Sequence, residues 1–230
     1  MIKLSQSNQL SGEILVPSDK SISHRAAILN AIAIGTSHIS NYSDGDDCES
    51  TLNILTYLGV NIKKTISDNQ LNLTIEGKGL DGLSEPLVTL DAGNSGTTTR
   101  LISGILSAVS FKSQLSGDQF LNKRPMKRII DPLLSMGANI QSDNFTAPLF
   151  FSPSKLNGID YQMNIASAQV KSCILIAALY ASSPTMISQP ALSRDHTERM
   201  LESMGAKIEI NKLDISLSPG PINSVDIQVP

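Results

Sequence analysis

The sequence repeats one pattern three times, and no other feature limits so strongly the folds that this chain can adopt. The repeat is anchored by the segments LGVNI (58–62), MGANI (136–140) and MGAKI (204–208). Their glycines lie 78 and 68 residues apart (59 to 137, and 137 to 205). Each anchor follows an amphipathic helical pattern and precedes a strand-like one. A repeat of this length indicates that one supersecondary unit is used three times, so equivalent loops should lie close together.

Each unit is predicted to be βαβαββ, with the units at about 17–80, 86–153 and 160–219. The first helices are predicted at 22–34, 97–110 and 170–181, and the second helices at 48–58, 126–136 and 195–204. The strands that open the units are predicted at 13–16, 87–91 and 161–165. Pro132 lies inside a predicted helix and predicts a kink or a late start there. Asp195 stands three residues before Glu198, which is the spacing of a capping box.

The first helix of each unit is apolar on nearly every side, as in the stretch CILIAAL (173–179). A helix of this kind is buried. Three such helices in one chain should pack together at a shared centre, with the sheets outside them. The alternation in 71–75 also indicates a strand with one face in water. The predicted fold class is therefore α/β (α+β), with three βαβαββ units around buried parallel helices.

Composition argues against several classes of function. The 230 residues carry a net charge of −3 and no block of Lys or Arg, which argues against nucleic acid or a membrane surface as a partner. No apolar run approaches the ~18 residues that a membrane-spanning helix needs. Cys48 and Cys173 cannot build a disulfide framework, so we expect a reduced, cytoplasmic chain. The three histidines are scattered, and we expect no metal and no cofactor.

Three polar loops precede the apolar helices and carry the candidate chemistry. Helix N-termini present free N–H groups and partial positive charge, so they bind phosphate and carboxylate groups well. The residues of interest are Lys20, Ser21 and Arg25 in the first loop, Asn94, Gly96 and Thr97 in the second, and Ser167, Ala168, Gln169 and Lys171 in the third. Arg124 and Arg194 add cations near the starts of two further helices.

Each of these signals has an ordinary alternative when it is taken alone. The loops also fit capped helix ends or plain turns, and both arginines also fit a solvated surface. Their repetition at equivalent places in three units favours an anion-binding site where the loops converge.

In these segments the chain resembles the EPSP synthase family, the 3-phosphoshikimate 1-carboxyvinyltransferases. The matching segments are DKSISHRA (19–26), GNSGTTTR (93–100), RPM (124–126), SAQVK (167–171) and RDHTE (194–198). They occur in the family's order over nearly the whole chain, and the last two are similar to the subgroup called class II. Ser18 stands where that subgroup usually has glycine.

The resemblance implies an activity and a site. The family transfers the enolpyruvyl group of phosphoenolpyruvate to the 5-hydroxyl of shikimate 3-phosphate, by addition and then elimination, without a metal. The resemblance implies that shikimate 3-phosphate is held by Ser21, Arg25, Ser167, Ala168 and Arg194. It implies that phosphoenolpyruvate is faced by Asn94, Gly96, Thr97 and Arg124, that Lys20 contacts both substrates, and that Gln169 lies between them.

The resemblance also implies a domain organisation. Family members have a second domain of similar size that carries catalytic acidic residues, so no catalytic residue is assigned to this chain. We expect 1–16 to belong to that other domain, 17–222 to form the three-unit substrate-binding domain, and 223–230 to begin the crossover. The chain should bind ligand as a monomer, with the C-terminal domain of the same enzyme as its partner, and should not turn over alone.

Two other interpretations stay open on the sequence alone. A UDP-N-acetylglucosamine enolpyruvyl transferase has the same fold but uses a loop cysteine, and the corresponding stretch 119–124 contains none. The other alternative is a phosphometabolite-binding module without chemistry.

Overall fold

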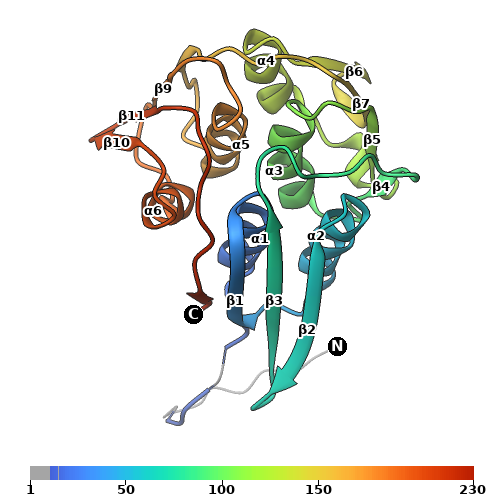
Figure 1. Cartoon of the computed structure of the whole chain (residues 1–230), viewed down its shortest axis with the longest axis vertical. Coiled ribbons are helices and arrows are strands. Elements are labelled where there is room, and N and C mark those ends of the chain that lie inside the picture. The colour runs from blue at the N-terminus through green and yellow to red at the C-terminus, as the bar shows by residue number, and fades with distance from the viewer. Residues whose placement is uncertain (1–10, 15) are drawn as a thin grey trace, which may run out of the picture.

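The computed structural model of the protein describes residues 11–14 and 16–230. The helices are α1 (Lys20–Ala31), α2 (Asp46–Tyr57), α3 (Gly96–Leu106), α4 (Lys127–Ser135), α5 (Ala168–Ala178) and α6 (His196–Ser203), with the 3₁₀ turn η1 (Leu121–Lys123) (Figure 1). The strands are β1 (Ile34–Tyr42), β2 (Asn61–Ser67), β3 (Gln70–Lys78), β4 (Leu90–Asp91), β5 (Ser113–Ser116), β6 (Asn139–Asp143), β7 (Thr146–Ser152), β8 (Asp160–Gln162), β9 (Thr185–Ser188), β10 (Ile208–Asn211), β11 (Asp214–Leu217) and β12 (Ile227–Gln228).

Three four-stranded sheets share one strand order, which confirms the threefold repeat. The orders are β12-β1-β3-β2, β4-β5-β7-β6 and β8-β9-β11-β10. In every sheet the first two strands pair in parallel and the other pairs are antiparallel. Because strand order, direction and position agree across all three sheets, each sheet is the same structural unit built from different residues.

The prediction for the opening strand of the first unit is wrong. It was placed at 13–16, yet Glu13, Ile14 and Val16 belong to no strand, and residue 15 lies outside the described residues, as does most of the predicted 1–16 segment. The equivalent position beside β1 is filled by β12, where Ile227 pairs with Ile39. A short apolar run does not reveal its partner, because strand pairing is decided by long-range packing. The roles proposed for 1–16 and 223–230 between domains stay predictions.

The three anchor glycines end the second helix of each unit in the same way. Gly59, Gly137 and Gly205 have φ of 87°, 95° and 81°, a left-handed conformation that glycine adopts without strain. In each case the glycine N–H and the next N–H bond back to carbonyls of the last helical turn, as Gly59 does to Thr56 and Val60 to Leu55. This is the Schellman pattern of helix termination. The repeat in sequence is therefore a repeated helix stop.

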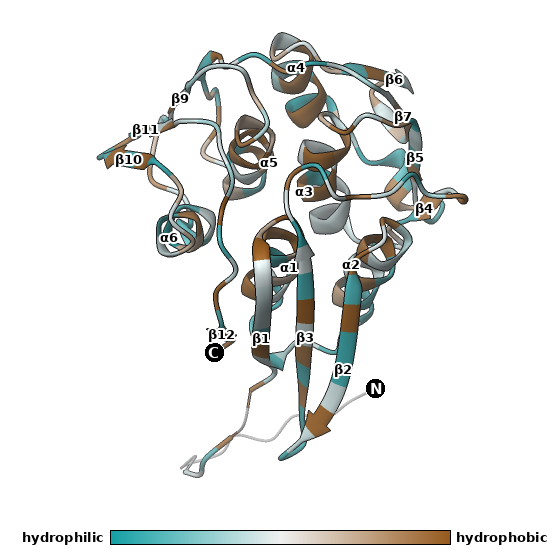
Figure 2. Ribbon diagram, in the orientation of Figure 1, coloured by the Kyte–Doolittle hydropathy of each residue, from teal (hydrophilic) through white to brown (hydrophobic). Residues whose placement is uncertain are grey.

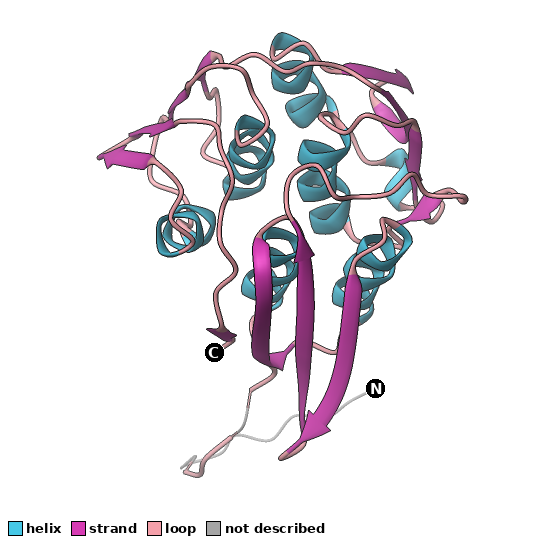
Figure 3. Ribbon diagram, in the orientation of Figure 1, coloured by secondary structure: helices cyan, strands magenta, loops and turns pink. Residues whose placement is uncertain are grey.

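The first helices, α1, α3 and α5, lie at the centre with the sheets outside them, as predicted (Figure 3). The helix α3 packs against both α1 and α5. Nine residues of α5 are buried in succession, from Val170 to Ala178, so this helix has no wet face. In Figure 2 the apolar colouring is clear on α3 and α5, whereas the outer strand β2 alternates between apolar and polar residues. The core thus fixes the central helices, and through them the positions of their N-termini.

Several helix ends differ from the prediction by a few residues. The helix α1 begins at Lys20 rather than 22, and α3 ends at Leu106 rather than 110. Pro132 is accommodated inside α4, which begins at Lys127. The capping-box prediction is wrong, because the side chain of Asp195 makes no capping hydrogen bond to α6.

Candidate anion-binding site

The N-terminus of each central helix is closed by a side-chain cap that leaves its loop polar. Asp19 Oδ1 accepts from the Ile22 N–H at 2.7 Å, Ser95 Oγ from the Thr98 N–H at 3.1 Å, and Ser167 Oγ from the Val170 N–H at 3.5 Å. Asp and Ser are preferred caps because a short side chain can satisfy an otherwise free N–H. Each cap accepts from only one of the N–H groups that have no partner inside the helix. The other N–H groups of the first turn point out of the helix end, toward the polar loop. The three predicted loops are thus structurally equivalent.

Arg25 ties α1 to α5 and α6. Its Nε donates to Thr197 Oγ1 at 2.8 Å, one terminal nitrogen donates to Ser172 Oγ at 2.9 Å, and the other to the Ser21 carbonyl at 2.9 Å. Only 3% of Arg25 is exposed. Burial lowers the pKa of its guanidinium to about 10, and the nearby charge of Arg194 lowers it further in the same direction. Arg25 is still a cation at neutral pH, and three of its five N–H donors are committed to the protein frame.

A buried chain of hydroxyl groups ties α1 to α3. His24 Nδ1 and Thr51 Oγ1 lie 2.7 Å apart, and Thr51 Oγ1 lies 2.7 Å from Thr98 Oγ1. Thr98 in turn bonds to the Ser95 cap at 2.7 Å. Burial lowers the pKa of His24 to about 4, so its imidazole is neutral at pH 7. His24 therefore acts here as a neutral hydrogen-bonding residue of the frame.

Gln169 joins the starts of α3 and α5. Its Nε2 donates to Thr97 Oγ1 at 2.9 Å, and its Oε1 accepts from Arg100 at 2.7 Å. Together with the two links described above, this bond connects all three central helices at their N-terminal ends. The structure therefore brings the three predicted loops together on one face, which we call the donor face.

One edge of the donor face is formed by the first loop and the start of α6. The Lys20 ammonium lies 2.7 Å from the Asp47 carboxylate, with 52% of the Lys20 side chain exposed. Arg194 donates to Ser21 Oγ at 3.2 Å. Both cations have partners, Asp47 and Ser21, that are partly exposed polar groups rather than residues of the core. An incoming anion can therefore compete for them at little cost.

The other edge is formed by the second loop and the residues before α4. Arg124 donates to Asn94 Oδ1, and Asn94 donates to Asp118 Oδ2 at 2.7 Å. The backbone N–H of Leu121, then the Asn94 amide, lower the pKa of the Asp118 carboxyl. A Cβ added to Gly96 would lie 3.0 Å from an Arg100 terminal nitrogen and 3.3 Å from one of Arg124. The absence of a side chain at 96 thus lets two guanidinium groups approach the start of α3.

Lys171 does not contribute to the donor face, although its position in the third loop predicted an available ammonium. Its Nζ lies 2.5 Å from Glu198 Oε1, and the two side chains are only 1% and 3% exposed. This pairing also engages Glu198, the second residue of the predicted capping box. Glu198 points into the interface between α5 and α6, so it cannot reach back to its own helix start.

Arg100, Ser172 and Thr197 contribute to the site without having been predicted. Arg100 stands four residues after Gly96, one helical turn along α3, and this spacing was the available signal. Ser172 and Thr197 hold Arg25 but lie inside helices, where their hydroxyl groups give no sequence signal. Of the predicted site residues, Ala168 begins α5, and the remainder lie at the helix starts or edges described above.

Metal and membrane features can be assessed for the described part of the chain. Within residues 11–14 and 16–230, no helix is long and apolar enough to cross a membrane, and no cluster of three metal-ligating side chains occurs. Both cysteines are buried, as their helical positions predicted, and their thiols are free.

The fold and the donor face together define a class of protein. Three units, each of two helices and a four-stranded sheet, present capped helix N-termini and several guanidinium groups on one face, a combination suited to phosphorylated and carboxylated ligands.

Comparison with known proteins identifies the family. The model of EPSP synthase (3-phosphoshikimate 1-carboxyvinyltransferase) matches residues 4–230. A 3-phosphoshikimate 1-carboxyvinyltransferase of Ruthia magnifica subsp. Calyptogena magnifica is 52% identical over 225 residues, 97% of this chain and 51% of the relative. One from Bacillus subtilis (strain 168) is 46% identical, over 96% of this chain and 51% of the relative. The chain belongs to the EPSP synthase family.

A solved structure supports the same assignment. EPSP synthase from Acinetobacter baumannii superposes with a TM-score of 0.89 at 44% identity, over 95% of this chain and 49% of that one. The chain thus spans about half the length of the relatives that it matches.

Proposed function

We propose that this chain provides the substrate-binding half of an enolpyruvyl transfer site. The ligands are shikimate 3-phosphate and phosphoenolpyruvate, and the reaction yields the enolpyruvyl ether and phosphate. Membership of the EPSP synthase family supports the reaction. The observation that carries the proposal is the hydrogen-bonded joining of three helix N-termini into one donor face, because two polyanions need many fixed donors and cations.

The two edges of the donor face have different proposed ligands. Shikimate 3-phosphate lies against Ser21, Arg25, Ser167, Ala168 and Arg194. Phosphoenolpyruvate lies against Asn94, Gly96, Thr97 and Arg124. The hydrogen bond from Arg194 to Ser21 and that from Arg124 to Asn94 support this division, since each joins residues proposed for the same ligand.

Lys20 and Gln169 are proposed to act between the two ligands. Gln169 bridges α5 and α3, so its amide lies at the boundary of the two edges. Lys20 pairs with Asp47, whose backbone carbonyl accepts from Thr98 on α3 at 3.2 Å. This contact holds the Lys20 ammonium near α3 although it belongs to α1, which is what contact with both substrates requires.

We assign proton transfer to the half of the relatives that this chain does not span. The donor face offers cations and neutral donors, whereas addition and elimination also need a general acid and base. The proposal therefore includes the C-terminal domain of the same enzyme as a partner, and no turnover by these 230 residues alone. We also propose that the protein is a monomer in the cytoplasm.

Calorimetric titration of shikimate 3-phosphate into the chain tests the proposal. We expect saturable binding to one site, weakened at least about tenfold by Arg194→Gln, because a charge-assisted hydrogen bond contributes roughly 1.5–3 kcal/mol. Arg199→Gln is the control: Arg199 lies on α6, five residues after Arg194, and changing its exposed side chain should leave affinity unchanged. Absence of binding at millimolar ligand, or equal loss in both variants, would contradict the assignment. Steady-state phosphate release would refute the absence of turnover.

A further inference from the structure

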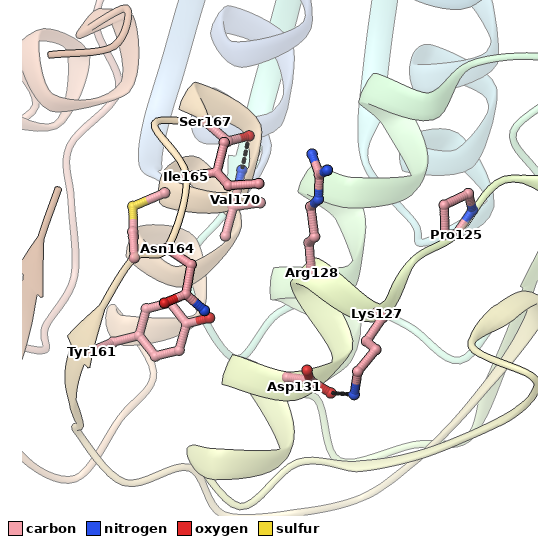
Figure 4. A pocket seen from close by; sticks show the side chains of 10 residues that line it. Pro125, Lys127, Arg128, Asp131, Tyr161, Asn164, Ile165, Ser167 and Val170 are labelled. Carbon is pink, nitrogen blue, oxygen red and sulfur yellow. Dashed lines mark hydrogen bonds and ion pairs between the residues drawn. The ribbon is translucent and has the colours of Figure 1, made fainter. Parts of the chain in front are cut away.

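A groove lies beside the donor face, between α4 on one side and β8 with the start of α5 on the other (Figure 4). Its volume is about 430 Å³, within the roughly 300–1,000 Å³ that small-molecule sites occupy. The lining includes Lys127, Arg128, Tyr161, Asn164, Ile165 and Val170. Apart from Ser167 at its edge, the groove contains none of the residues assigned to the two substrates.

The walls of the groove are mostly apolar, with a few polar groups. Val170 is buried, while Ile165 beside it is 52% exposed (Figure 4). Tyr161, from β8, and Asn164, from the loop after it, lie side by side on one wall of the groove (Figure 4). Among the described residues, neither side chain has a hydrogen-bond partner. Such a lining provides an apolar surface for a ligand, with polar groups that are free to orient it.

The charge of the groove is positive and comes from one residue. Lys127 Nζ pairs with Asp131 Oδ1 at 2.9 Å, so these two charges offset each other. Arg128 forms no ion pair or hydrogen bond within the described part of the chain, and it extends between α4 and the start of α5 (Figure 4). Burial lowers the pKa of the Arg100 guanidinium, and the nearby positive charges of Arg124 and Arg128 lower it further. Arg128 thus adds a third guanidinium to an already cationic region.

We propose that the groove binds a small organic monoanion, a carboxylate carried on an apolar ring or chain. The carboxylate pairs with the Arg128 guanidinium, whose planar donors match it in bidentate geometry. The apolar body lies against Ile165 and Val170, with the Tyr161 hydroxyl near the opening. Inorganic phosphate would leave the apolar wall in contact with water, so the walls favour a carboxylate with a hydrophobic body. This site adjoins the donor face and shares Ser167 with it, but it uses other ligand-binding groups and does not depend on the proposed function.

Methyl NMR of the 230-residue chain can test the site with benzoate as the probe. We expect saturable shifts of the Ile165 methyl signals at millimolar benzoate. Benzamide has the same shape without the charge and should bind at least about tenfold more weakly, because it loses the charge-assisted pair. Inorganic phosphate should not move these signals. Equal affinity for benzoate and benzamide would overturn the proposed role of charge.

Variants locate the probe in the groove. Arg128→Gln should weaken benzoate binding about tenfold or more, whereas Arg199→Gln, an exposed arginine on α6, should leave it unchanged. Ile165→Ser should weaken it about fivefold by removing part of the apolar wall. All these side chains are exposed, so the variants should stay folded, as an amide spectrum can verify. Loss of the benzoate shifts in Arg194→Gln but not in Arg128→Gln would place the probe on the donor face and refute the inference.

Discussion

Replacing Lys171 with methionine should strongly destabilise the chain, because it leaves Glu198 charged and unpaired in the core. The two groups lie 2.5 Å apart with side chains 1% and 3% exposed. Among the described residues, Glu198 Oε2 has no hydrogen-bond partner. The ion pair between Lys171 and Glu198 Oε1 is therefore the main interaction that stabilises the buried carboxylate. Breaking a buried pair by removing one partner costs roughly 3–5 kcal/mol. Methionine keeps the apolar stem, so the loss reflects charge rather than volume.

Removing both charges should be far less costly than removing one. The double variant Lys171→Met, Glu198→Met replaces the pair with apolar groups of similar size, which is often neutral or stabilising. Part of the loss should remain, because Glu198 also attracts the buried Arg25 guanidinium. The coupling energy in the double-mutant cycle should therefore be large and favourable in the native protein.

Urea unfolding followed by circular dichroism measures these free energies. A loss of 3–5 kcal/mol corresponds to a fall in Tm of roughly 6–20 °C for a chain of this length. The control is Lys64→Met, which breaks a pair of similar length, 2.6 Å to Glu49, with both side chains over 40% exposed. Such an exposed pair contributes about 0–1 kcal/mol. Equal losses for the two single variants, or additive losses in the double variant, would refute the reasoning.

Three further predictions concern glycine, histidine and cysteine positions. Gly104→Ala should destabilise the chain by about 1–3 kcal/mol, because its Cβ would lie 2.6 Å from the Cys173 carbonyl oxygen on α5. The Cβ of Gly96→Ala would meet only the ends of two guanidinium groups. Thermal melts of that variant should therefore show little change, while titration shows weaker phosphoenolpyruvate binding. His24 has a native pKa of about 4 against an ordinary 6.5. As the pH falls, the unfolded chain therefore binds a proton at His24 before the folded chain does, and roughly 3 kcal/mol of stability is lost between pH 6.5 and pH 4. His24→Gln should reduce this dependence of the free energy of unfolding on pH, whereas the exposed control His38→Gln should not. The Cys173 thiol, whose pKa is raised by burial, should react with Ellman's reagent only after unfolding.

Each of these predictions has a result that would contradict it. Equal melting temperatures for the two glycine variants would mean that α3 and α5 are not in close contact at Gly104. An unchanged pH slope in His24→Gln would mean that another group is responsible. Rapid labelling of Cys173 in the native chain would mean that the central helices open readily.

The repeat and the central helices could be predicted because their signals are local. Each of these signals is contained in a short stretch of sequence, as in the helix-ending glycines at 59, 137 and 205 and the apolar stretch 173–179. The opening strand of the first unit could not, because β12 has only two residues and pairs with β1 across nearly the whole chain. Its position depends on tertiary packing, which short-range periodicity does not contain.

The candidate site shows the same division between local and long-range information. The positions of Ser21, Asn94 and Ser167 at helix starts followed from the sequence. The burial of Arg25 and Lys171 did not, since a charged residue near a helix start is normally exposed to solvent. Their partners Thr197 and Glu198 come from another helix, so only the folded chain reveals which cations are free for a ligand.

The most direct test of the central claim is to map backbone amide NMR shifts while shikimate 3-phosphate is added to the folded chain. The account predicts saturable shifts that cluster at the starts of α1, α5 and α6, at Lys20, Ser21, Ser167, Gln169 and Arg194. Shifts confined to other surfaces, or no shifts at millimolar ligand, would contradict the claim that these helix N-termini form a preassembled binding face.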